Sequence, residues 1–166
     1  DVCSSDLVGR VGRSQQCCRC DAECAAEKGR EGGRVEAKLG GKIGIGENIT
    51  IVQDTFGKVF NEGTDFQRDG SQFDRLFTDG DTYQIGRMTA FVMHTPGHTG
   101  ADVTYVIDKA AFVGDTMFMP DYGTARSDFP GGSAEALYRS IRKILALPAQ
   151  TRVFVGHDYL PEGRST

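Results

Sequence analysis

The sequence of 166 residues predicts a mixed α/β (α+β) domain. Two segments, 47–60 and 133–147, space their apolar side chains as a helix does when it packs on a core. Short apolar runs between and after them, separated by turns that contain Gly and Asp, predict strands. Hydrophobic residues make up 39% and charged residues 25% of the chain, which is typical of a globular protein and not of a disordered one.

The composition changes near residue 34. All five cysteines lie in the first 24 residues, whereas the ten Phe and five Tyr all lie after position 55. A segment without aromatic side chains and rich in glycine and charge has little to bury. We therefore predict that residues 1–34 are disordered or extraneous, and that residues 35–166 form the domain. Zinc binding by Cys17, Cys18, Cys20 and Cys24 is the alternative, but their spacing lacks paired C-x₂-C units.

The first helix, predicted over 47–60, follows a glycine-rich segment at 41–46. This segment lacks the third glycine of G-x-G-x-x-G and the G-K-[ST] ending of a phosphate-binding loop, so we expect a turn before the helix. Five apolar residues share one face of the predicted helix: Ile49, Val52, Phe56, Val59 and Phe60.

Strands are predicted at 82–85, 88–93, 102–107, 110–113 and 152–155, with a hairpin turn at Asp108 and Lys109. Residues 118–132 contain five Pro and Gly residues and predict an irregular loop. Ser133 is expected to cap the second helix, which Pro148 ends. This helix should bury Leu137, Ile141 and Leu145 and expose Arg139, Arg142 and Lys143.

A net charge of −4 gives the chain no general attraction to nucleic acid or to anionic membranes, so we expect neither as a partner. No apolar run approaches the ~20 residues of a membrane helix, and no basic stretch followed by an apolar one has the pattern of a signal peptide. These observations predict a cytoplasmic protein.

The three histidines and one aspartate mark the candidate site. Three apolar runs end just before His94 and His98, before Asp115, and before His157. Strands packed side by side bring such positions to one edge of a sheet, where ligand sites commonly lie. Two imidazoles and a carboxylate at His98, Asp115 and His157 suit Zn²⁺ or the 2-His-1-carboxylate site of non-heme Fe²⁺.

Other interpretations of these residues remain open. Metal-free acid–base chemistry is possible, but no Ser or Cys nucleophile lies nearby in the sequence. Each residue taken singly also fits an ordinary loop or turn. Pro96 and Gly97 prevent a helix between His94 and His98, so we expect His94 to support the site or the fold rather than to bind the ion.

The motifs HTPGHT (94–99), VGDT (113–116) and GHDY (156–159) together resemble the metal motifs of the metallo-β-lactamase superfamily. The stretches DYGTARSDFPGG (121–132) and GHDYLPEGR (156–164) resemble its persulfide dioxygenase branch, which is close to glyoxalase II. The resemblance covers about residues 37–164 and implies part of an αββα sandwich.

The resemblance also implies an activity and its residues. It implies one Fe²⁺ held by His98 and Asp115, the candidate catalytic residues, with His157 near the iron or binding a second metal ion. Arg126 and Tyr159 match positions that contact a glutathione-derived substrate, and Asp128 could orient Arg126. A loop ion pair and a packed aromatic ring are the alternatives for these residues. The expected reaction is oxidation of glutathione persulfide by O₂, and a homodimer is possible.

The chain departs from this family at one point. The third iron ligand of the family comes from an N-terminal H-x-H-x-D-H motif, yet no histidine precedes His94 here. We therefore expect an N-terminally truncated domain with impaired metal binding. Glyoxalase II-like thioester hydrolysis with one or two Zn²⁺ ions, or an inactive fragment, are the alternatives.

Overall fold

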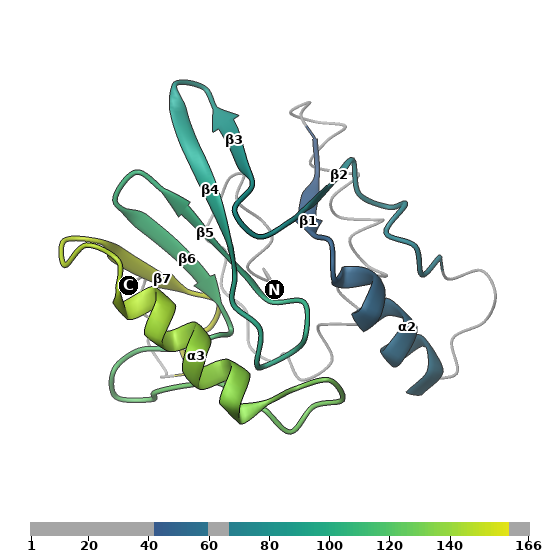
Figure 1. Ribbon diagram of the computed structural model, residues 1–166. Coiled ribbons are helices and arrows are strands. Elements are labelled where there is room, and N and C mark those ends of the chain that lie inside the picture. The colour runs from purple at the N-terminus through teal and green to yellow at the C-terminus, as the bar shows by residue number, and fades with distance from the viewer. Residues whose placement is uncertain (1–41, 60–66, 160–166) are drawn as a thin grey trace.

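The computed structural model describes residues 42–59 and 67–159, which form two sheets and two helices (Figure 1). The predicted boundary at residue 34 and the five cysteines lie outside these residues, so both interpretations stay predictions. The elements in chain order are β1 (Gly44–Gly46), α2 (Ile49–Val59), β2 (Arg75–Phe77), β3 (Thr82–Ile85), β4 (Met88–His94), β5 (Val103–Ile107), β6 (Ala110–Gly114), α3 (Ala134–Leu145) and β7 (Arg152–Val155).

The larger sheet has the strand order β3-β4-β5-β6-β7. Neighbouring strands are antiparallel as far as β6, and β7 runs parallel to β6. The predicted hairpin between β5 and β6 is confirmed, with Asp108 at a φ of 51° in its turn. Because β4, β6 and β7 run in the same direction, their carboxyl ends meet at one edge of the sheet.

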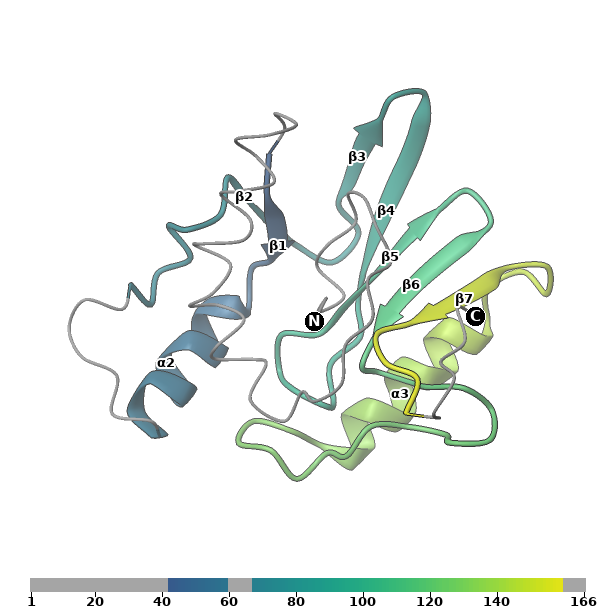
Figure 2. The same ribbon diagram turned by 180° about the vertical axis from the view of Figure 1, so that it is seen from behind.

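The elements stack as four layers, which Figure 2 shows from behind. On one face of the larger sheet, Ile144 of α3 packs with Ala111 and Val113 of β6. On the other face, Phe77 of β2 packs with Val92 and Tyr105. The remaining helix, α2, covers the far side of the parallel pair β1–β2, where its apolar side chains contact Ile45 and Leu76. The order is therefore helix, sheet, sheet, helix, as an αββα sandwich requires.

Helix α3 begins after Ser133 as predicted, because the Ser133 side chain accepts a hydrogen bond from the Ala136 amide at 3.2 Å. Its buried face, however, differs from the prediction. Ser140 and Ile144 are buried beside Leu137, whereas Leu145 is 64% exposed and Ile141 is half-buried. The buried face of α3 is rotated relative to the predicted face. The cause is the small Ser140 side chain, whose hydroxyl donates to the Pro96 carbonyl at 2.7 Å and holds this side of the helix against the loop after β4.

Helix α2 and the glycines before it also differ from the prediction. Val59 is 58% exposed because it lies at the rim of the buried stripe formed by Ile49, Val52 and Phe56, and Phe60 lies outside the described residues. Gly44 and Gly46 belong to β1 and not to a turn. A Cβ on Gly46 would lie 2.7 Å from Val103 Cγ1, so the close approach of the two sheets explains this glycine.

The loop predicted at 118–132 is irregular, apart from an isolated bridge between Met117 and Thr124 at its start. In the part of the chain that the structure describes, neither helix is long and apolar enough to span a bilayer.

Candidate functional site at the sheet edge

Three loops meet at the carboxyl edge of β4, β6 and β7. The hydroxyl of Thr116, after β6, donates to the Thr95 carbonyl, after β4, at 3.2 Å. The amide of Gly156, after β7, donates to the Gly114 carbonyl at 2.8 Å. The sheet topology thus brings together the loops that carry the candidate residues, as the sequence predicted.

The loop after β4 holds His98 through its neighbours in sequence. Gly97 has a φ of 147°, and a Cβ there would overlap the backbone of Leu137 at the start of α3. Thr99 is held by Asp102, whose carboxylate accepts the Thr99 amide at 2.7 Å and the Thr99 hydroxyl at 2.8 Å. The HTPGHT sequence therefore starts a fixed connection from β4 to β5 that packs against the first turn of α3.

The His98 imidazole is buried and its protonation pattern follows from its partner. Nδ1 lies 2.8 Å from the carbonyl oxygen of Arg126. A carbonyl can only accept, so Nδ1 carries a proton, and the tautomer compatible with this contact has its unprotonated nitrogen at Nε2. This is the tautomer that a metal-binding histidine needs, and a backbone carbonyl is a usual partner for its other nitrogen.

Asp115 and His157 are in direct contact. The Nδ1 nitrogen of His157 lies 2.6 Å from Oδ1 of Asp115, and the His157 and Asp115 side chains are only 8% and 14% exposed, respectively. Gly156 permits this approach, since a Cβ at that position would lie 2.5 Å from the same oxygen. The contact is a shielded imidazole–carboxylate hydrogen bond.

Tyr159 extends this pair toward solvent. Its ring stacks on His157 with the centroids 5.6 Å apart and an interplanar angle of 17°. Phe118 packs edge-on against Tyr159 at 5.3 Å, and Tyr122 lies 5.0 Å from it. No sequence pattern singles out Phe118 or Tyr122 as site residues, although Tyr122 belongs to the 121–132 stretch that carries the resemblance.

Arg126 and Asp128 form a bidentate ion pair, with Nε–Oδ1 at 2.5 Å and Nη2–Oδ2 at 2.7 Å. The hydrogen bonds from the Arg126 guanidinium hold the pKa of Asp128 below its usual value. Both side chains are exposed, so the pair orients the guanidinium more than it stabilises the fold. Asp128 is therefore placed where it could orient Arg126, and the roles of both residues toward a substrate stay predictions.

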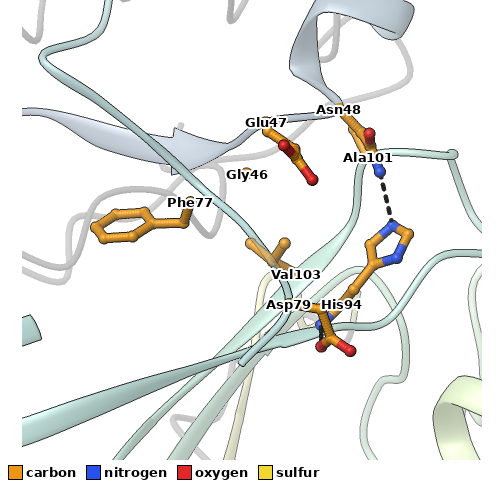
Figure 3. A pocket seen from close by; sticks show the side chains of 8 residues that line it. All are labelled: Gly46, Glu47, Asn48, Phe77, Asp79, His94, Ala101 and Val103. Carbon is orange, nitrogen blue, oxygen red and sulfur yellow. Dashed lines mark hydrogen bonds between the residues drawn. The ribbon is translucent and has the colours of Figure 1, made fainter. Parts of the chain in front are cut away.

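His94 lies beside a small cavity (Figure 3). Its Nε2 is 3.1 Å from Asn48 Nδ2 and 3.1 Å from the Gly100 carbonyl. Its backbone amide donates to Asp79 at 2.6 Å, and its carbonyl accepts from Lys143 at 2.9 Å. The cavity holds about 40 Å³, far below the ~300–1,000 Å³ of small-molecule sites, so it cannot take a tripeptide. These contacts are those of a residue that joins elements of the fold.

The imidazole and carboxylate donors at this edge suit Zn²⁺ or Fe²⁺, but too few of them gather to complete a metal site. Within residues 42–59 and 67–159, no three His, Cys, Asp or Glu side chains gather so that they could hold an ion. Asp115 and His157 form a pair, and the Nδ1 nitrogen of His98 is bonded to a backbone carbonyl. Catalytic zinc sites use three protein ligands. These residues alone therefore do not fit a resident metal ion, and ligation by His98, Asp115 and His157 stays a prediction.

Comparison with known proteins shows which family the chain resembles. The chain is 57% identical over 141 residues to a probable metallo-hydrolase of Burkholderia pseudomallei, covering 79% of this chain and 48% of the relative. It is 43% identical over 88 residues to a hydroxyacylglutathione hydrolase of Rhodospirillum rubrum, covering 52% of this chain and 33% of that protein. It is 40% identical over 93 residues to the mitochondrial persulfide dioxygenase ETHE1 of Bos taurus, covering 54% of this chain and 36% of that protein.

Among solved structures, ETHE1 from Myxococcus xanthus superimposes with a TM-score of 0.51 at 34% identity, covering 56% of this chain and 40% of that one. The chain spans less than half the length of each of the three curated relatives. The family model of the metallo-beta-lactamase superfamily matches residues 21–157, which include every candidate site residue except Tyr159. By this match and by its four layers, the chain belongs to the metallo-beta-lactamase superfamily.

Proposed function

We propose that this chain is part of a glutathione persulfide dioxygenase that depends on Fe²⁺. The overall reaction consumes one persulfide, one O₂ and one water, and yields glutathione and sulfite with its protons. Bound Fe²⁺ would supply the redox chemistry. The described residues hold only part of its ligand set, so their role is to position the substrate and to fix the protons of the candidate ligands.

The observation that carries the proposal is that each candidate substrate residue directly adjoins a candidate ligand. Tyr159 stacks on His157, whose Nδ1 is hydrogen-bonded to Asp115. The backbone carbonyl of Arg126 accepts the Nδ1 proton of His98. A ligand that touched Tyr159 or Arg126 would therefore lie within one residue of the candidate reaction centre.

The chemistry of these side chains suits the tripeptide. Glutathione carries two carboxylates, and a guanidinium binds carboxylates through paired N–H donors. Asp128 engages the Nε and Nη2 donors of Arg126 and so orients the guanidinium, and a substrate carboxylate would approach the other edge, formed by Nη1 and Nη2. The Tyr159 phenol can donate one hydrogen bond, and the residue is 47% exposed beside Tyr122.

Thioester hydrolysis is the second candidate, because the Rhodospirillum relative is named a hydroxyacylglutathione hydrolase. Both candidate activities use a glutathione-derived substrate and differ in O₂ consumption. The third candidate, an inactive chain, is favoured by the absence of a three-ligand cluster among the described residues.

A chimera separates the three candidates. Residues 1–34 are replaced by the corresponding segment of the Burkholderia relative, and the purified protein is loaded with Fe²⁺ under argon. We expect O₂ uptake and sulfite formation with glutathione persulfide, both abolished by His98→Gln and unchanged by the exposed Asp54→Asn control. Hydrolysis of a lactoylglutathione thioester without O₂ uptake would instead identify a hydrolase. A folded chimera with neither activity would refute both enzymatic candidates.

A further inference from the structure

Phe129 lies between two residues of the candidate site. The His98 imidazole stands perpendicular to its ring, with the centroids 5.0 Å apart and an interplanar angle of 89°. The guanidinium carbon of Arg126 lies 4.8 Å from the centre of the same ring. One aromatic side chain thus contacts both the imidazole and the guanidinium.

The Phe129 ring also packs against side chains of α2. Its centroid is 6.4 Å from that of Phe56, and it packs against the buried cluster of Ile49, Val52, Phe56 and Phe73. Because interiors are close-packed, a ring fixed on this cluster cannot move away from His98 without disturbing the cluster. Helix α2 therefore supports the His98 imidazole indirectly, through the Phe129 ring.

A hydrogen bond and a ring contact both act on the orientation of the His98 imidazole. The Arg126 carbonyl receives the Nδ1 proton at 2.8 Å, and Phe129 contacts the imidazole ring. A rotation of the imidazole out of its present plane would turn Nδ1–H away from the carbonyl oxygen and weaken the hydrogen bond that favours this tautomer. Perpendicular aromatic contacts depend on the angle between the two rings, so the Phe129 ring opposes this rotation.

We propose that Phe129 is a positioning residue for His98. It keeps Nδ1–H on the Arg126 carbonyl and leaves Nε2 as the unprotonated nitrogen. Through its contact with the Arg126 guanidinium, it couples the candidate ligand to the candidate substrate residue. That Nε2 would bind the metal ion rests on the proposed function. The orientation of the ring itself follows from the geometry and can be tested without metal or substrate.

The test is the tautomer of His98 in the ¹⁵N-labelled 166-residue chain. Long-range ¹H–¹⁵N spectra are recorded with a chelator at pH 8, where an imidazole of ordinary pKa is neutral. With only three histidines in the chain, His94→Gln and His157→Gln assign the signals. We expect the unmodified chain to show His98 protonated at Nδ1. Phe129→Leu should lower the ratio of this tautomer to the other about 2- to 10-fold, the factor equivalent to one aromatic contact.

Two further variants separate positioning from packing. Phe129→Tyr keeps the ring and should restore the single tautomer. Phe73→Leu removes a ring from the same buried cluster, where Phe73 packs with Ile49, Val52 and Phe56, so it should leave the tautomer unchanged. If Phe129→Leu does not fold, Phe129→Met replaces it, because a flexible side chain fills the same space without an aromatic face.

Three results would overturn the proposal. They are an Nε2-protonated His98 in the unmodified chain, an unchanged tautomer in the folded Leu or Met variant, and an equal change in Phe73→Leu. Inactivity of the chimera would refute the proposed function and leave these spectra unaffected, so the two failures can be told apart.

Discussion

Replacing Asp115 with Asn tests the hydrogen bond that joins β6 to the loop after β7. Asp115 and His157 are 2.6 Å apart, and the pair is largely shielded from solvent. Asn keeps the shape and one oxygen acceptor but removes the charge. Hydrogen bonds to charged groups contribute about 1.5–3 kcal/mol and neutral ones about 0.5–1.5 kcal/mol. We therefore expect the free energy of unfolding to fall by about 1–1.5 kcal/mol.

Urea denaturation followed by circular dichroism, with a chelator present, measures this loss without any contribution from bound metal. In thermal melts, by the usual scaling for a chain of this length, Tm should fall by about 2–6 °C. Asp54→Asn is the matched control, because it also neutralises an aspartate beside a cation but lies on the exposed face of α2 with Lys58. Its urea midpoint should equal that of the unmodified chain.

A double-mutant cycle identifies the partner. In a His157→Gln background the Asp115 carboxylate no longer has its imidazole partner. Asp115→Asn should therefore lower the free energy of unfolding clearly less there than in the unmodified chain. The reasoning is refuted if Asp115→Asn leaves the midpoint unchanged, or if its full cost persists without His157.

Three further predictions concern the core, the His98 turn and metal binding. Tyr105→Phe should raise the free energy of unfolding at pH 7 by about 1 kcal/mol, because the phenol is buried with no hydrogen-bond partner among the described residues. Burial also raises the pKa of Tyr105, so unfolded chains release this proton above about pH 10 while folded chains keep it, and stability falls as the pH rises further. Urea midpoints at pH 7 and pH 10.5 should show that this alkaline loss is smaller in the variant. Gly97→Ala should destabilise the chain by about 2 kcal/mol or more, through overlap with Leu137 and a φ of 147°. In calorimetric melts, Gly100→Ala, whose Cβ would meet nothing closer than 3.8 Å, should change Tm little. The purified 166-residue chain should retain far less than one Fe²⁺ or Zn²⁺ after dialysis, and stoichiometric metal by mass spectrometry would contradict the incomplete ligand set.

Local patterns predicted most elements of the described fold. Short apolar runs separated by turns with Gly and Asp predicted β3 to β6, and the Ser133 cap predicted the start of α3. The strand ends before His98, Asp115 and His157 predicted a shared sheet edge, and the strand directions confirm it. Such signals depend on residues close in sequence, so they are visible without a structure.

Contacts between distant segments were not predictable in the same way. The face that α3 buries depends on Ser140 meeting the Pro96 carbonyl, 44 residues away. The glycine at 46 is required by Val103 on another sheet, and not by a turn in its own segment. No local pattern carries either fact, because each depends on where a remote backbone lies.

The candidate site also combines features that the sequence predicts with contacts that only the folded structure shows. The sequence by itself determined which side chains follow the strand ends, because His98, Asp115 and His157 each come after an apolar run. Only the tertiary structure decided what each one touches: a backbone carbonyl and the Phe129 ring for His98, and a direct hydrogen bond between Asp115 and His157. Hydrogen bonds and ring contacts act over a few ångströms in space, so residues that are far apart in sequence share them only after the layers have packed.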